Sequence, residues 1–79
     1  MSIAQVRRLI DGRGMPYPGP LMALIKEIHE GEPGAAFEVL VSDPESERDI
    51  PAWLRKAGQE LLDTFRDTDY TGYVVRKVA

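Results

Sequence analysis

Two segments of the chain carry apolar residues at positions i, i+3, i+4 and i+7, which is the spacing of an amphipathic helix. Each segment has one apolar stripe and a polar opposite side, so each helix can bury only one face. Both helices therefore need a second layer to cover that face. The stripes are Leu21, Leu24, Ile25 and Ile28 in the first segment and Ile50, Trp53, Leu54 and Ala57 in the second.

Four further segments are predicted as strands, because apolar and β-branched residues alternate or cluster in them. They are residues 5–10, 37–42, 61–65 and 72–78, and the polar residues 67–69 predict a turn between the last two. The resulting order, β-α-β-α-β-β, predicts an α/β (α+β) two-layer sandwich with a four-stranded mixed sheet and both helices on one face. The first two strands should be parallel and the last two antiparallel.

Prolines and polar residues indicate where the helices begin. The first helix is expected to start around the prolines of 18–20, where proline is tolerated, and to end at Gly31. In the second helix, Ser46 with Asp49 is predicted to form the capping pair, which would leave Pro51 in about the first turn.

Composition limits the classes of function. Seventy-nine residues, 43% hydrophobic and 29% charged, suffice for one globular domain covering 1–79. A formal net charge of −3 offers no basic surface for nucleic acid or for an anionic membrane. No apolar run is long enough to span a bilayer, and the first ten residues lack the apolar centre of a signal peptide, so the cytoplasm is the expected compartment.

The chain contains no cysteine and one histidine, His29. The lack of thiols excludes disulfides, thiolate zinc sites, iron–sulfur clusters and thiol nucleophiles. The acidic run 43–49 lacks the glycine and spacing of a calcium loop. We therefore expect no metal and no cofactor, and we interpret His29 as a surface residue in the last helical turn.

Three aromatic residues have informative positions in the predicted elements. Trp53 lies on an apolar stripe, which favours a place in the core. Tyr70 and Tyr73 lie on or near the last predicted strand. We expect both tyrosines on the open face of the sheet, where they could contact another protein.

Residues 11–20 form a loop with three glycines and three prolines, DGRGMPYPGP. This loop resembles the signature D-x-R-G-φ-x-C-P-x-P of the TusA/SirA-like family of sulfur carriers, where φ is apolar. Residues 43–51, DPESERDIP, resemble a second stretch of that family, D-P-x-x-x-x-D-I-P. The positions that match the loop signature are Asp11, Arg13, Gly14, Met15, Pro18 and Pro20, and Tyr17 stands where the family has its cysteine.

The resemblance implies the family's two-layer fold and a role in sulfur transfer. Members of the family carry sulfur as a cysteine persulfide and pass it to partner proteins. The cysteine lies just before a helix N-terminus, whose free amides and positive dipole end favour the thiolate. Partners implied for this chain are sulfur-trafficking proteins, namely rhodanese-like proteins, DsrE-like proteins or a cysteine desulfurase, or an active paralogue.

Tyr17 changes what the family's chemistry implies for this chain. A phenol with a pKa of about 10 stays protonated at neutral pH, and its oxygen cannot hold a persulfide. We therefore expect no catalytic residue and no enzymatic activity. The favoured function is non-catalytic protein binding or regulation associated with sulfur trafficking. The predicted binding residues are Asp11, Arg13, Gly14, Tyr17, Pro18 and Pro20.

Three alternatives stay open at this point. Tyr17 could simply cover the end of the first helix with its ring. The chain could be a sulfur carrier whose native cysteine at position 17 has been replaced in this sequence. Arg13 and the loop amides could bind an anion or small ligand before the first helix, while Asp11 would be a turn residue and no general base.

Overall fold

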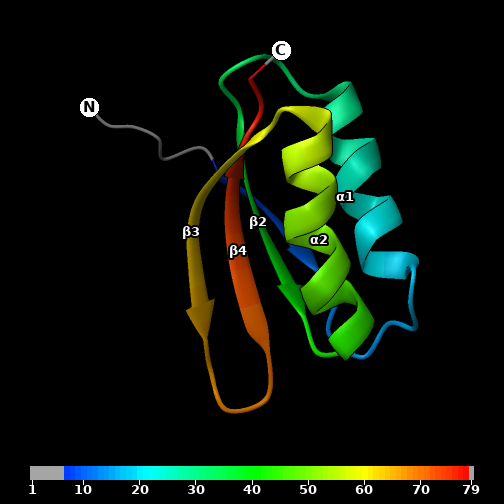
Figure 1. Cartoon of the computed structure of the whole chain (residues 1–79). Coiled ribbons are helices and arrows are strands. Elements are labelled where there is room, and N and C mark those ends of the chain that lie inside the picture. Colours follow the sequence, from blue (N-terminus) through cyan, green and yellow to red (C-terminus); the bar gives the residue numbers. More distant parts are fainter. Residues whose placement is uncertain (1–6, 79) are drawn as a thin grey trace.

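The computed structural model describes residues 7–78. The observed order of elements is the predicted one, with two helices and four strands (Figure 1). Along the chain, the elements are β1 (Arg7–Asp11), α1 (Gly19–Glu30), β2 (Ala36–Val41), α2 (Pro44–Ala57), β3 (Glu60–Arg66) and β4 (Thr71–Arg76). The expected strand residues Gln5 and Val6 lie outside the described part, and the last strand ends at Arg76, two residues earlier than predicted.

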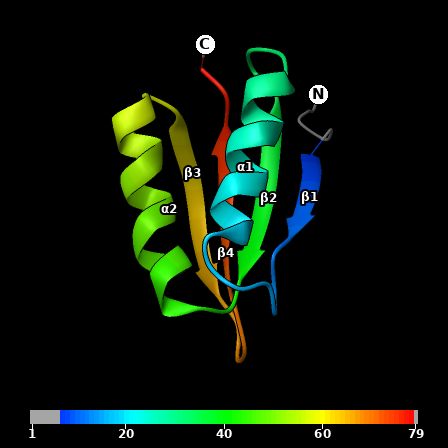
Figure 2. The same cartoon turned by 90° about the vertical axis from the view of Figure 1, so that its right-hand side faces the viewer.

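The four strands form one mixed sheet in the order β1-β2-β4-β3. β1 pairs with β2 in parallel, whereas β4 pairs antiparallel with both β2 and β3. α1 and α2 lie side by side on one face of the sheet, which leaves the other face without helices (Figure 2). The predicted two-layer fold is confirmed. No helix within residues 7–78 is long and apolar enough to cross a membrane.

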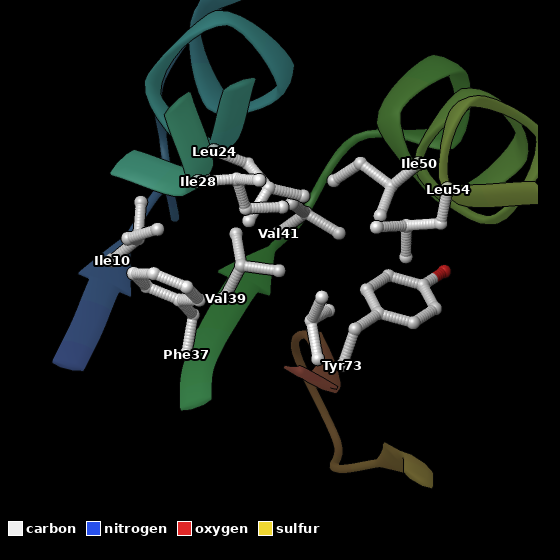
Figure 3. Close-up of a cluster of buried hydrophobic side chains, with 10 residues drawn as sticks. Ile10, Leu24, Ile28, Phe37, Val39, Val41, Ile50, Leu54 and Tyr73 are labelled. Atoms are coloured by element: carbon white, nitrogen blue, oxygen red, sulfur yellow. The ribbon is translucent and has the colours of Figure 1, made fainter. Parts of the chain in front are cut away.

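The core lies between the helices and the sheet (Figure 3). Every second residue of β2 points into it, because side chains alternate between the two faces of a strand. Trp53 packs against this core while only half-buried, so the predicted core position holds in part. The fully enclosed members include Leu24, Phe37, Val39, Val41, Ile50 and Val75.

The start of α2 differs from the prediction. The helix begins at Pro44, and its N-cap is Asp43, whose carboxylate accepts a hydrogen bond from the Ser46 amide at 2.9 Å. The predicted pair of Ser46 and Asp49 was wrong, because Asp43 offers a capping oxygen three residues earlier and proline is favoured directly after a cap.

Pro51 consequently lies inside α2 and not in its first turn. A proline has no N–H, so the carbonyl of Glu47 loses its helical donor. Tyr73 supplies a replacement, because its hydroxyl donates to the Glu47 carbonyl at 3.0 Å. Tyr73 is 3% exposed and faces the helices, so its predicted place on the open face was wrong.

Candidate functional site

The loop of residues 12–18 connects the end of β1 to the start of α1 (Figure 2). The N-termini of both helices and the tip of the β3–β4 hairpin lie at this same end of the molecule (Figure 1). The amide of Gly12 donates to the Leu40 carbonyl at 2.8 Å, and the amide of Gly14 donates to the Ser42 hydroxyl at 2.9 Å. The end of β2 therefore holds the first half of the loop.

Glycine is required at both of these anchoring positions. A Cβ atom at Gly12 would lie 2.8 Å from the Leu40 carbonyl oxygen and 2.8 Å from the Pro20 Cβ atom. Gly14 has a φ of 78°, a conformation that side chains disfavour. Gly14, a predicted binding residue, thus has a clear role in shaping the loop.

Asp11 and Arg13 form a bidentate ion pair at the start of the loop. The Nε and NH2 atoms of Arg13 each lie 2.8 Å from a carboxylate oxygen of Asp11. Hydrogen bonds from Arg13 lower the pKa of Asp11 from 3.8 to about 2. The guanidinium also lies over the ring of Tyr70, 5.0 Å from its centroid, which joins the loop to the hairpin. These contacts occupy Arg13, so the arrangement does not favour the anion-binding alternative.

Tyr17 joins the loop to α2. Its hydroxyl donates a hydrogen bond to the carboxylate of Asp49, which also accepts one from Arg48 at 2.9 Å. The bond to Asp49 raises the pKa of the Tyr17 phenol, whereas Arg48 first and Tyr17 second lower the pKa of Asp49. The two stretches that resemble the family's motifs therefore meet at this hydrogen bond. The sequence interpretation placed Asp49 in a cap and missed this contact.

The two predicted proline residues of the site have different positions. Pro18 is the exposed N-cap residue of α1, follows a cis peptide bond and accepts a hydrogen bond from the Met22 amide at 2.9 Å. Pro20 is fully buried. Pro20 therefore fixes the helix to the core and is not accessible to a ligand.

Exposed apolar side chains surround the start of α1. Met15 is 42% exposed, Tyr17 41% and Met22 57%. Met15 lies against Gly19 in the first turn, and Met22 follows Gly19 by three residues, on the same side of the helix. We call Met15, Tyr17 and Met22 the loop patch. Apolar surface of this kind is typical of sites that bind other proteins.

The groups around Tyr17 keep its phenol protonated. Within residues 7–78, the charged neighbours that act on its phenol are Asp49, Arg48 and Glu45. Asp49 is ionised and bound to Arg48, and the raised pKa of Tyr17 keeps its oxygen protonated. In the same range, no three histidine or acidic residues are grouped so that they could hold a metal ion. His29 is exposed in the last turn of α1, at the far end of that helix.

Replacing Asp49 with asparagine is expected to lower the pKa of Tyr17 toward its ordinary value of about 10. The Asp49 carboxylate favours the protonated form of the Tyr17 phenol. The stability that this hydrogen bond contributes to the fold is therefore present below pH ~10, and it is lost as the pH rises through the raised pKa of Tyr17. A pH titration followed by NMR of the Tyr17 ring carbon bonded to oxygen measures the shift. The control is Asp63→Asn, which removes an exposed carboxylate on β3. If Tyr17 titrated equally in both variants, Asp49 would not be the cause of its raised pKa.

Comparisons with known proteins give matches along nearly the whole chain. The profile of the family described as Sulfurtransferase TusA matches residues 8–77. A protein of Archaeoglobus fulgidus named as a sulfur carrier is 46% identical over 70 residues, which are 89% of this chain and 96% of that protein. The sulfur carrier protein TusA of Pseudomonas paraeruginosa is 31% identical over 94% of this chain and 94% of its own length.

A solved structure shows the same fold. The SirA-like protein of Desulfitobacterium hafniense matches with a TM-score of 0.76 at 20% identity, over 90% of this chain and 97% of that one. Together these matches define the class, a small α/β protein related to sulfur carriers. The chain belongs to the TusA family.

Proposed function

We propose that this chain is a non-catalytic, protein-binding or regulatory member of the TusA family that acts in sulfur trafficking in the cytoplasm. The observation that carries the proposal is the position of Tyr17. The family's fold and signature loop are retained around it, but the position of the sulfur-carrying thiol holds a phenol that is bound to Asp49. A scaffold retained without its reactive atom is best explained by what its surface binds.

The loop patch supports protein binding at this position. Met15, Tyr17 and Met22 leave two flexible thioethers and one aromatic ring in contact with solvent. Methionine adapts to irregular partner surfaces, and tyrosine is among the residues that dominate binding energy at interfaces. Asp11, Arg13 and Gly14 support this role indirectly, because their contacts fix the loop to β2 and to the hairpin.

The expected partners are proteins that donate, relay or accept sulfur. They include cysteine desulfurases, rhodanese-like and DsrE-like proteins, and a TusA-family paralogue that retains its cysteine. A chain without a thiol could occupy the docking site that such a paralogue uses, and it would thereby limit sulfur flow without taking part in it. Nucleic acid and membranes are not proposed as partners, because the net charge is −3.

The test is pairwise binding to purified partners of these classes from the organism that encodes the chain. We expect at least one to bind with a micromolar Kd in calorimetry, and Tyr17→Ala to weaken that binding by about tenfold or more. Leu62→Ala removes an equally exposed apolar side chain on β3, away from the loop, and should leave the Kd unchanged. Absence of binding to every class, or equal weakening by both variants, would refute the proposal.

A further inference from the structure

A groove between α1 and α2 adjoins the loop patch. It has a volume of about 240 Å³ and a mostly apolar lining. Leu21 contributes from α1, and the remaining lining residues come from α2. We call this the helix groove; its lining is Leu21, Asp49, Ala52, Trp53 and Lys56. Asp49 belongs to the groove and also holds the Tyr17 hydroxyl, so the groove and the loop patch form one continuous surface.

On the α2 side, an acidic residue lies just beyond one end of the helix groove and a basic residue lines the other end. Glu45, Asp49, Ala52 and Lys56 follow one another at intervals of three or four residues, which places them along one side of the helix. Glu45 lies at the Tyr17 end, where its charge acts on the phenol, and Lys56 lines the other end. Lys56 follows Glu45 by eleven positions, which corresponds to about 16 Å along a helix.

These two terminal charges are available to a partner. Glu45 and Lys56 are both exposed, and neither forms a direct ion pair within residues 7–78. The guanidinium of Arg48 bonds directly to Asp49, which is the main cause of its raised pKa, and the charge of Glu45 only adds to that effect. Asp49, by contrast, is already bound by Arg48 and Tyr17. The surface therefore offers an apolar groove, an exposed carboxylate about one helical turn beyond its Asp49 end and an exposed ammonium group at its Lys56 end.

We propose that the helix groove binds a protein segment with one apolar anchor side chain, a basic residue toward Glu45 and an acidic residue toward Lys56. This inference rests on the proposed function and defines the chemistry of the partner. The volume suits a single large side chain and not an extended apolar helix. The opposite charges at the two ends fix the direction in which the segment lies, because the reversed segment would place like charges together.

Selection from random peptides displayed on phage tests the proposal without a known partner. We expect recovered peptides to share an apolar residue with a basic residue on one side and an acidic residue on the other. The double variant Glu45→Lys with Lys56→Glu keeps the net charge and should recover the opposite charge order. A matched control, Lys26→Glu with Glu30→Lys, swaps an exposed ion pair on α1 outside the groove and should recover the original order.

Affinities of the selected peptides give the second measurement. Trp53 is the chain's one tryptophan and lines the groove, so its fluorescence reports binding directly. We expect a selected peptide to bind at least about tenfold tighter than the same peptide with its charges exchanged, and the charge-swapped variant should invert this preference. Ala52→Phe fills the groove and should abolish the fluorescence change.

Several outcomes would overturn the inference. The phage selection could enrich no peptide, recover apolar peptides without ordered charges, or recover the same charge order with the charge-swapped variant. Sedimentation experiments could instead show that a second copy of the chain occupies the groove. These outcomes are separate from a failure of the proposed function. If a sulfur-transfer protein binds and Tyr17→Ala weakens it while the charge-swapped variant does not, the loop patch is the docking site and only the groove inference is lost.

Discussion

Replacing Phe37 with alanine is expected to lower the free energy of unfolding by about 3–5 kcal/mol. Phe37 is the largest of the fully buried side chains and lies on β2, at the side of the core next to Ile10 (Figure 3). Its ring ends beneath the C-terminus of α1, where a Cβ atom at Gly31 would lie 2.9 Å from the ring. The substitution removes the ring that fills this space, and we expect it to leave a cavity.

The loss is large for a domain of this size. At about 0.05–0.15 kcal/mol per residue, a domain of this length is expected to have a total stability of about 4–12 kcal/mol. Urea unfolding followed by circular dichroism measures the change. Leu62→Ala, which truncates an exposed residue of β3, should cost less than about 1 kcal/mol. If the two variants lost similar stability, the assigned position of the core would be wrong.

The order of elements could be predicted from sequence because each has a clear period or a clear end. The stripe of Leu24 and Ile28 on α1 and the alternation of Phe37, Val39 and Val41 on β2 correspond directly to the observed core. Parallel pairing of β1 and β2 follows from the helix that connects them. These features are local, so the sequence contains them in full.

The face that Tyr73 occupies could not be predicted with the same reasoning. In a strand such as TGYVVR, apolar residues occur at successive positions, so alternation does not distinguish the two sides. The orientation depends on pairing with β2, where Tyr73 lies opposite Val39, and on the donor that Pro51 makes necessary at Glu47. Both are relations between distant parts of the chain.

The candidate site could be predicted only in part, because one of its contacts also joins distant parts of the chain. The signature loop was evident from its glycines and prolines, and Tyr17 was evident as its one departure from the family's pattern. The hydrogen bond from Tyr17 to Asp49 joins residues 32 apart in sequence. They meet because both helices begin at the same end of the sheet, a consequence of topology that no local pattern contains (Figure 1).

Replacing Tyr17 with cysteine is expected to convert a chain that takes up no sulfur into one that takes up one sulfur atom per molecule. The introduced thiolate would attack a terminal sulfur of inorganic polysulfide, forming a new S–S bond and hence a cysteine persulfide. The S–S bond of the polysulfide breaks, and the shortened polysulfide leaves with the electron pair. Intact-mass spectrometry should show an adduct of one sulfur atom that a reductant removes, whereas the unmodified sequence and Tyr17→Ser should show none.

Two opposing electrostatic effects on the pKa of the introduced thiol would set the rate of this reaction. The N-terminus of α1 has no side-chain cap and favours the thiolate at position 17, whereas the Asp49 carboxylate disfavours it. Asp49→Asn in the Tyr17→Cys background should therefore lower the pKa of the thiol and raise its reaction rate at neutral pH. An adduct on Tyr17→Cys would show that one side chain separates this scaffold from the family's chemistry. If no adduct formed on the folded variant, the loop itself would have lost the geometry for sulfur transfer, and docking would be its only function.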